Sequence, residues 1–260
     1  MVEFKVVTSK ENPLIKLTSL LQSSTKARRE NGLYVLEGLR ICFDAYENGI
    51  LFDKLIISDT AQQKYSDDID KLSQKSNECF KIPDSLFKKI SDTATPQGII
   101  AIAKIPCNDI NQVDINGRYI ALENVADPSN LGAVARTAEA LGVSGIILSS
   151  LGCDPYSPKA LRASMGTLLR MPVIQLKDFS GEIKNIGLKT YSCVVDSTAK
   201  DIKEISFENG CVLIIGNEAN GITDSMKAVS DELITIPMSG RAESLNAAVA
   251  ASISMWEMMK

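Results

Sequence analysis

Three polar stretches, each containing glycine, carry the side chains of this chain that are best suited to chemistry. They are residues 124–137 (NVADPSNLGAVART), 214–222 (IIGNEANGI) and 236–246 (IPMSGRAESLN). Arg136 offers a guanidinium that binds phosphate or carboxylate oxygens, Glu218 offers a carboxylate and Ser244 a hydroxyl. The chain has no histidine, which excludes the Ser-His-Asp triad, the Cys-His pair and histidine zinc sites. Any chemistry of this chain must therefore use groups other than imidazole.

The composition predicts a soluble, cytoplasmic protein. The 260 residues are 45% hydrophobic and 23% charged, enough for a substantial core in one large or, as we expect, two smaller domains. No apolar run reaches the roughly 18 residues of a membrane span, and residues 1–5 lack a signal-peptide core. The six cysteines show no C-x-x-C spacing and several lie in apolar runs, so we expect free, structural thiols and no metal site.

Charge is unevenly distributed along the chain. The net charge of -4 argues against nonspecific coating of nucleic acid. Residues 1–40 nevertheless carry seven Lys or Arg against four Asp or Glu, with Lys26, Arg28 and Arg29 in one cluster. This cluster fits either a basic RNA-binding face or an ordinary solvated helix surface.

The first hundred residues predict a compact α/β unit that opens with a helix at Pro13. We expect strands at 34–38, 54–58, 79–82 and 98–103, and helices at 39–47, 60–76 and from 83. The polar segment 106–117, rich in Asn and Asp, lacks periodicity and marks the domain boundary. We therefore expect a domain over 1–107, a linker over 108–117 and a second domain over 118–260.

The second domain predicts a parallel sheet covered by helices on both faces, because continuous apolar strands alternate with helices. Expected strands are 119–122, 145–148, 173–176, 191–195, 212–215 and 233–236, with helices at 131–141, 158–170, near 181–186 and from about 244. In such sheets ligands bind at the carboxyl ends of strands, where the three polar stretches lie. Gly216 would let backbone approach a ligand closely, although a plain strand-to-helix turn also fits. No dinucleotide or nucleoside-triphosphate phosphate motif occurs.

Several charged and capping residues leave alternatives open. Arg136, in an otherwise apolar helix, needs an anion or substrate, or else reaches solvent or pairs with Glu139 or Glu123. Lys159 and Arg162 lie about one helical turn apart, a spacing that fits a phosphate-binding site and a solvent-exposed helix face equally well. Ser244 and Asn246 are capping-type residues before an alanine-rich final helix. That helix carries an apolar stripe and should be buried against the ligand loops or a second subunit; the stripe is Leu245, Val249, Ile253 and Trp256.

Taken in order, the three stretches resemble the motifs of the SpoU/TrmH family of RNA ribose 2'-O-methyltransferases, within the SPOUT superfamily. Residues 36–40 (LEGLR) and 91–99 (SDTATPQGI) also resemble the substrate-binding domain often attached to this family. The resemblance thus covers nearly the full chain. It implies an α/β fold whose C-terminal region threads into a trefoil knot, beside a smaller ribosomal-protein-like RNA-binding domain, in a homodimer with each cofactor site near the subunit interface.

The resemblance also implies S-adenosylmethionine as cofactor and RNA as partner, with no metal. It makes Arg136 the catalytic residue, either general base or electrostatic anchor, supported by Asn130, Glu218, Ser244 and Asn246. Cofactor contacts would come from Gly216, Asn217, Ile236, Met238 and Leu245. RNA contacts would come from the basic residues Lys26, Arg28, Arg29, Arg40, Lys159 and Arg162.

Two other functions remain to be separated from methyl transfer. One is a non-catalytic RNA-binding or assembly protein on the same fold, and the other an α/β enzyme for a different nucleotide cofactor. Binding of S-adenosylmethionine distinguishes both from the main hypothesis. Ribosomal RNA is favoured over transfer RNA, because the N-terminal region is similar to domains of ribosomal RNA enzymes.

Overall fold

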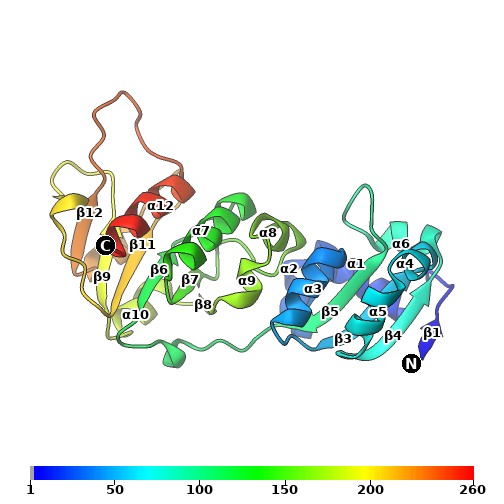
Figure 1. Ribbon diagram of the computed structural model, residues 1–260. Coiled ribbons are helices and arrows are strands. Elements are labelled where there is room, and N and C mark those ends of the chain that lie inside the picture. Colours follow the sequence, from blue (N-terminus) through cyan, green and yellow to red (C-terminus); the bar gives the residue numbers. More distant parts are fainter. Residues whose placement is uncertain (1–2) are drawn as a thin grey trace. The chain divides into compact units, whose positions relative to one another are not determined.

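The computed structural model describes residues 3–260 (Figure 1). Met1 and Val2, which open the segment examined for a signal peptide, lie outside the described residues. By contacts the chain divides into two compact units. The first comprises Met1–Pro106 with Tyr156–Arg162, and the second Cys107–Pro155 with Ala163–Lys260. No helix among residues 3–260 is long and apolar enough to cross a membrane.

The first unit is built on a five-stranded mixed sheet of order β1-β4-β3-β5-β2. β4 is parallel to β1 and β3, whereas β5 is antiparallel to β2 and β3. Its strands are β1 (Phe4–Val6), β2 (Leu33–Glu37), β3 (Phe52–Ser58), β4 (Ser76–Ile82) and β5 (Ile99–Lys104). Its helices are α1 (Pro13–Ser23), α2 (Thr25–Asn31), α3 (Leu39–Glu47), α4 (Asp59–Lys64), α5 (Ser66–Ser73) and α6 (Asp84–Ile90).

α1 and α6 lie on the same face of this sheet. The side chain of Asn12 caps α1 by accepting a hydrogen bond from Leu14 N, and Pro13 occupies the first turn, where a missing N–H costs nothing. One core cluster joins residues of α1 and α6 to alternate residues of β3 and β5, among them Ile56, Ile100 and Ile102. This burial holds the two helices side by side.

The second unit contains a seven-stranded sheet of order β10-β12-β9-β11-β6-β7-β8, in which every pairing is parallel. The strands are β6 (Arg118–Leu122), β7 (Gly145–Ser149), β8 (Val173–Leu176), β9 (Lys189–Cys193), β10 (Lys200–Asp201), β11 (Cys211–Ile215) and β12 (Glu232–Thr235). The helices are α7 (Pro128–Leu141), α9 (Thr167–Arg170), α10 (Phe179–Lys184), α11 (Asp224–Val229) and α12 (Ala247–Met258), with short 3-10 turns η1 (Ile110–Gln112) and η2 (Ile202–Glu204). α8 (Pro158–Ala163) belongs, up to Arg162, to the first unit. The predicted parallel sheet is confirmed.

Helices cover both faces of this sheet. α10 and α11 bury Phe179, Ile183 and Met226 in a cluster with Val212 and Ile214 of β11. α12 packs against α7 and over β11 and β6, so it lies on the opposite face (Figure 1). The loops that leave β6, β11 and β12 therefore emerge at one carboxyl edge of a sheet whose two faces are closed.

Several predicted elements differ from those observed. A short strand, β1, precedes the helix that was expected to open the chain. The helix expected over 60–76 is broken at Tyr65 into α4 and α5, each of which buries its own apolar residues. The helix expected over 158–170 is interrupted by Met165 (φ 50°) and Gly166 (φ 86°), whose left-handed backbone cannot continue an α-helix.

The final helix also begins later than expected. Asn246 caps it, accepting hydrogen bonds from Ala248 N and Val249 N at 2.9 and 3.3 Å, whereas Ser244 is exposed in the preceding loop. Of the two alternatives for its apolar stripe, the structure does not show burial of Val249, Ile253 and Trp256 against the ligand loops, and burial against a second subunit stays a prediction. Val249, Ile253 and Trp256 are 46%, 37% and 58% exposed, because the small residues of the opposite side face α7 and the sheet.

Candidate active site

The loop after β11 folds back on itself at Gly216. Asn217 N donates to Gly221 O at 3.2 Å, and Gly221 N donates to Asn217 O at 2.8 Å. A Cβ atom on Gly216 would lie 2.2 Å from Gly221 C and 2.4 Å from Ile222 N. Only glycine permits this approach of backbone to backbone. The strand-to-helix loop is therefore a tight ring, and the close approach that Gly216 permits is to the loop's own backbone.

Asn217 joins this ring to the loop after β6. Its Nδ2 donates to Asn124 O at 2.8 Å, and its Oδ1 accepts from Ala219 N at 2.8 Å. Glu123, which is 4% exposed, accepts from Thr223 N at 2.9 Å and from Thr223 Oγ1 at 2.6 Å. These bonds across neighbouring strands fix the two loops to each other at the edge of the sheet.

The three polar stretches meet at Asn130. This side chain, 9% exposed, donates from Nδ2 to Glu218 Oε1, and its Oδ1 accepts from Asn246 Nδ2 at 3.1 Å. Asn130 lies in the first turn of α7, Glu218 lies in the loop after β11, and Asn246 caps α12. Residues up to 116 positions apart in sequence thus form one polar chain.

A cavity of about 460 Å³ adjoins this polar chain. All five residues predicted to contact a cofactor line it: Gly216, Asn217, Ile236, Met238 and Leu245. Glu218 and Ser244 line it as well. The structure brings these residues together because the loops after β11 and β12 face the same edge of the sheet.

The cavity includes residues that sequence reasoning missed. Val194, Val195 and Asp196 follow β9, and Lys227 lies on α11. Asp196 Oδ1 accepts from Thr198 N and Thr198 Oγ1, both at 2.8 Å. These bonds, together with the charge of Lys227, hold the pKa of the Asp196 carboxyl below its usual range. The position of Asp196 just beyond the carboxyl end of a strand could have indicated from the sequence that it lies at the ligand site.

Arg136 does not line this cavity. It is exposed on α7 on the same face as Ala133 and Ala140, and α7 is tied to α12 by the Thr137 and Ser252 hydroxyls at 3.2 Å. Glu139, one suggested partner, binds Arg170 at 2.6 Å instead. Glu123, the other, is occupied by Thr223. Within residues 3–260 neither carboxylate neutralises Arg136, whose guanidinium faces solvent.

A family model described as the SpoU rRNA Methylase family matches residues 117–256, more than half of the chain. The chain belongs to the SpoU rRNA methylase family. The match contains all three polar stretches and every residue of the cavity. A second model, the MRM3-like substrate binding domain, matches residues 12–101.

Three proteins similar to this SpoU family member match it over more than nine tenths of their own length. An uncharacterised tRNA/rRNA methyltransferase of Synechocystis sp. is 30% identical over 96% of this chain and 92% of that protein. The 23S rRNA (guanosine(2553)-2'-O)-methyltransferase RlmP of Bacillus subtilis is 27% identical over 98% of this chain and 99% of its own. An AdoMet-bound rRNA methyltransferase from Sinorhizobium meliloti has a TM-score of 0.85 at 28% identity, over 98% of this chain and 97% of that one.

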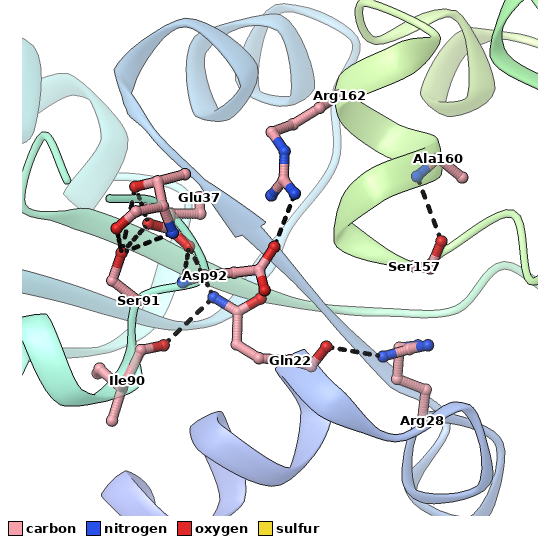
Figure 2. A network of polar contacts seen from close by, with 10 residues as sticks. Gln22, Arg28, Glu37, Ile90, Ser91, Asp92, Ser157, Ala160 and Arg162 are labelled. Carbon is pink, nitrogen blue, oxygen red and sulfur yellow. Dashed lines mark hydrogen bonds and ion pairs between the residues drawn. The ribbon is translucent and has the colours of Figure 1, made fainter. Parts of the chain in front are cut away.

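In the unit that contains the substrate-binding match, Glu37 organises a loop (Figure 2). Its carboxylate accepts hydrogen bonds from Gln22 Nε2 and Asp92 N, both at 2.8 Å, from Thr93 Oγ1 at 2.7 Å, and from Ser91 Oγ. Four donors on one carboxylate fix the beginning of the 91–97 loop and join it to α1. Residues 37 and 91–93 belong to the two stretches that suggested a substrate-binding domain.

One predicted RNA contact in this unit is wrong. Arg28 is 3% exposed, and its Nη1 donates to Leu21 O at 2.5 Å and to Gln22 O at 3.4 Å. Nη2 donates to Thr25 Oγ1 at 3.0 Å. Figure 2 shows this side chain turned toward the end of α1, where it satisfies carbonyl groups that the helix leaves without donors. Its charge serves the fold and is not available to RNA.

The other basic candidates are exposed. Lys26 lies 3.7 Å from Glu30, and Arg162 donates to Asp92 Oδ2 at 2.6 Å. Arg29, Arg40 and Lys159 also have exposed side chains. Arg162 and Lys159 belong to the segment Tyr156–Arg162, which makes its contacts within the first unit; there the Tyr156 ring lies 5.0 Å from that of Tyr34. RNA binding by these exposed residues stays a prediction.

Proposed function

We propose that this protein is an S-adenosylmethionine-dependent methyltransferase that methylates a ribose 2'-hydroxyl in ribosomal RNA. The observation that carries the proposal is the polar chain of Glu218, Asn130 and Asn246, which joins the three family stretches beside a cavity of about 460 Å³. The names of relatives support rRNA as the substrate. The likeness of the N-terminal region to domains of ribosomal RNA enzymes favours ribosomal RNA over transfer RNA.

The lining of the cavity fits the proposed cofactor in polarity and in charge. Gly216 and Asn217 line the cavity beside Ile236, Met238 and Leu245, whose apolar side chains suit an adenine ring. Among the described residues, the lining contains three carboxylates, Asp196, Glu218 and Glu243, and one lysine, Lys227. This excess of negative charge favours a ligand with net positive charge, and S-adenosylmethionine carries a sulfonium and an ammonium against one carboxylate.

The chain's own residues supply alignment and charge. When bound, the cofactor provides an activated methyl group on sulfur. Alignment of the ribose hydroxyl with that group can lower the activation barrier by up to roughly 7–11 kcal/mol. Asn130, held at both ends by Glu218 and Asn246, is rigid enough to orient the ribose. Ser244, at the cavity wall, offers a hydroxyl to the same substrate.

Arg136 serves as the electrostatic anchor for the substrate. A guanidinium does not release its proton in proteins, so it is poorly suited to act as a base. Its planar fork binds two oxygens of a phosphate at once, and it stabilises negative charge that develops on the hydroxyl oxygen. Arg136 is exposed and does not line the cavity of its own chain. Either the RNA substrate therefore reaches from Arg136 to this cavity, or Arg136 acts with the cavity of a second copy of the chain.

We also propose a homodimer through the exposed faces of α7 and α12. Val249, Ile253 and Trp256 form an exposed apolar stripe at helical spacing. α12 packs against α7 through Ser252 and Thr137, and Ala133 and Arg136 are exposed on α7. Burial of such a stripe is favourable at about 25 cal/mol per Å². The dimer would place Arg136 at the subunit interface, where it can act with the cavity of the partner subunit.

The family likeness carries three further proposals. The C-terminal region is threaded into a trefoil knot. Residues 1–107 form the RNA-binding domain, 108–117 the linker and 118–260 the methyltransferase domain. The protein works in the cytoplasm, because that compartment holds the ribosomal RNA.

The direct test is transfer of labelled methyl from S-adenosylmethionine to unmodified ribosomal RNA and transfer RNA in parallel, followed by nucleoside mass analysis. We expect label as a 2'-O-methylnucleoside in ribosomal RNA. Arg136→Lys keeps the charge but loses the planar fork, so turnover should fall about 100- to 1,000-fold while calorimetric cofactor affinity persists. Retained turnover in Arg136→Lys would refute the anchor role. Cofactor binding without label in either RNA would favour a non-catalytic protein.

A further inference from the structure

A groove between α1 and α6 in the first unit has no role in the site described above. Its volume is about 350 Å³. From α1 it is lined by residues one turn apart, Ile15, Lys16, Ser19, Leu20 and Ser23, and from α6 by Leu86, Lys89 and Ile90, with Lys10 at the turn before α1. The groove therefore follows the length of the two helices.

The walls of the groove are held at a fixed spacing. Ile15, Leu86 and Ile90 are buried in the core beneath it. At the far end of α1, Gln22 Nε2 donates to Ile90 O at 3.3 Å and to Glu37 Oε2 at 2.8 Å, which ties α1 both to the end of α6 and to the ordered 91–97 loop (Figure 2). The groove is consequently a preformed feature that ends beside the stretches resembling a substrate-binding domain.

Positive charge is concentrated on the rim. Lys10, Lys16 and Lys89 line the groove, and no acidic side chain of residues 3–260 lines it. Glu11 pairs with Lys16 at 2.6 Å, but the Glu11 side chain is 66% exposed and the Lys16 side chain 61%. A surface pair of this kind is worth about 0–1 kcal/mol, so a phosphate can replace it. By contrast, residues 44–84 of the same unit carry nine acids against five lysines.

We propose that this groove binds the sugar-phosphate backbone of the RNA substrate. The inference rests on the proposed function and extends it, by assigning Lys10, Lys16 and Lys89 to phosphates along the two helices. Leu20, which is 49% exposed between them, gives the face of a ribose or base an apolar surface. Lysines act as point charges without directional recognition, which suits a repeating polyanion better than a small ligand.

The test compares a groove variant, Lys10→Gln/Lys16→Gln/Lys89→Gln, with a control of equal charge change in the same unit, Lys64→Gln/Lys71→Gln/Lys104→Gln. Affinity for an unmodified ribosomal RNA fragment is measured against salt concentration. Three lost phosphate contacts reduce the slope of log K against log salt by about 2 to 3. Wild type should then lose about 16- to 64-fold more affinity than the groove variant between about 50 and 200 mM salt, whereas the control should follow wild type.

The RNA-binding and methyl-transfer measurements test the groove and the proposed function separately. If wild type methylates ribosomal RNA and the groove variant keeps its affinity and salt slope, the groove assignment is wrong and the function stands. An equal loss in the control, or equal binding of a polyglutamate peptide, would show that bulk charge alone is responsible. If RNA binding depends on the groove but wild type transfers no methyl, the groove stands and the function fails. Unchanged cofactor affinity and thermal unfolding verify that the groove variant is folded.

Discussion

Replacing Gly216 by alanine tests whether the loop after β11 must close for the cofactor to bind. The added Cβ would lie 2.2 Å from Gly221 C and 2.3 Å from Gly221 O, both backbone atoms that cannot rotate away. The ring must open, and the pair of hydrogen bonds between Asn217 and Gly221 is strained or lost. The wall of the cavity then leaves the shape that the ligand needs.

The magnitude follows from the cost of the clash. Overpacking a tight contact costs about 1–3 kcal/mol. The free protein relieves this strain by opening the loop, so a bound cofactor must restore the closed loop against it. Since every 1.4 kcal/mol is tenfold in affinity, we expect cofactor binding to weaken by about 5- to 150-fold.

Gly240→Ala is the matched control, because it lies in the loop after β12 and its added Cβ would meet nothing within 4 Å. Isothermal titration with S-adenosylmethionine should give wild-type affinity for Gly240→Ala and the predicted loss for Gly216→Ala. Urea unfolding of both variants tests whether the fold persists. Wild-type affinity in a folded Gly216→Ala protein would refute the argument that a closed ring forms the cofactor site.

Three further predictions concern other parts of the molecule. Trp256→Glu places a charge on the exposed stripe of α12 and should shift the protein from dimer to monomer, which sedimentation equilibrium measures; an unchanged dimer would exclude this face. A thiol reagent should label the exposed Cys107 in the native protein but reach Cys42 only on unfolding, because burial raises the pKa of the Cys42 thiol to about 12; peptide mass mapping of labelled native protein tests this. The hydrogen bond from Arg170 holds the pKa of Glu139 below its usual 4.5, so this pair stabilises the fold above that pH and the effect is lost as pH falls through the lowered value. Arg170→Met should therefore cost up to about 1 kcal/mol at neutral pH and nothing in strong acid, as measured by urea unfolding at both pH values; a cost that does not change with pH would contradict the assignment.

Most elements of the fold were predictable from local patterns. Apolar runs such as 212–215 and 119–122 predicted buried parallel strands, because a strand covered on both faces needs apolar side chains on both sides. The breaks at Tyr65 and Met165 were not predictable, since their reason lies in which residues each short helix buries and in a left-handed turn at Gly166. Nor did residues 4–6 predict a strand: β1 exists only by pairing with β4, more than seventy positions away.

In the candidate site, too, some features were predictable from the sequence and others were not. Residue types and spacing alone determined the absence of histidine chemistry, the glycine at the end of β11 and the likeness of three stretches to one family. Only the tertiary structure decided that Asn130 joins Glu218 to Asn246, that Asp196 and Lys227 enter the cavity, and that Arg28 is used inside its own unit. It also decided that α12 leaves Trp256 exposed, because the side of a helix that faces the core depends on which neighbours it meets. Local sequence limits what a side chain can do, whereas the partners that determine its role come from distant parts of the chain.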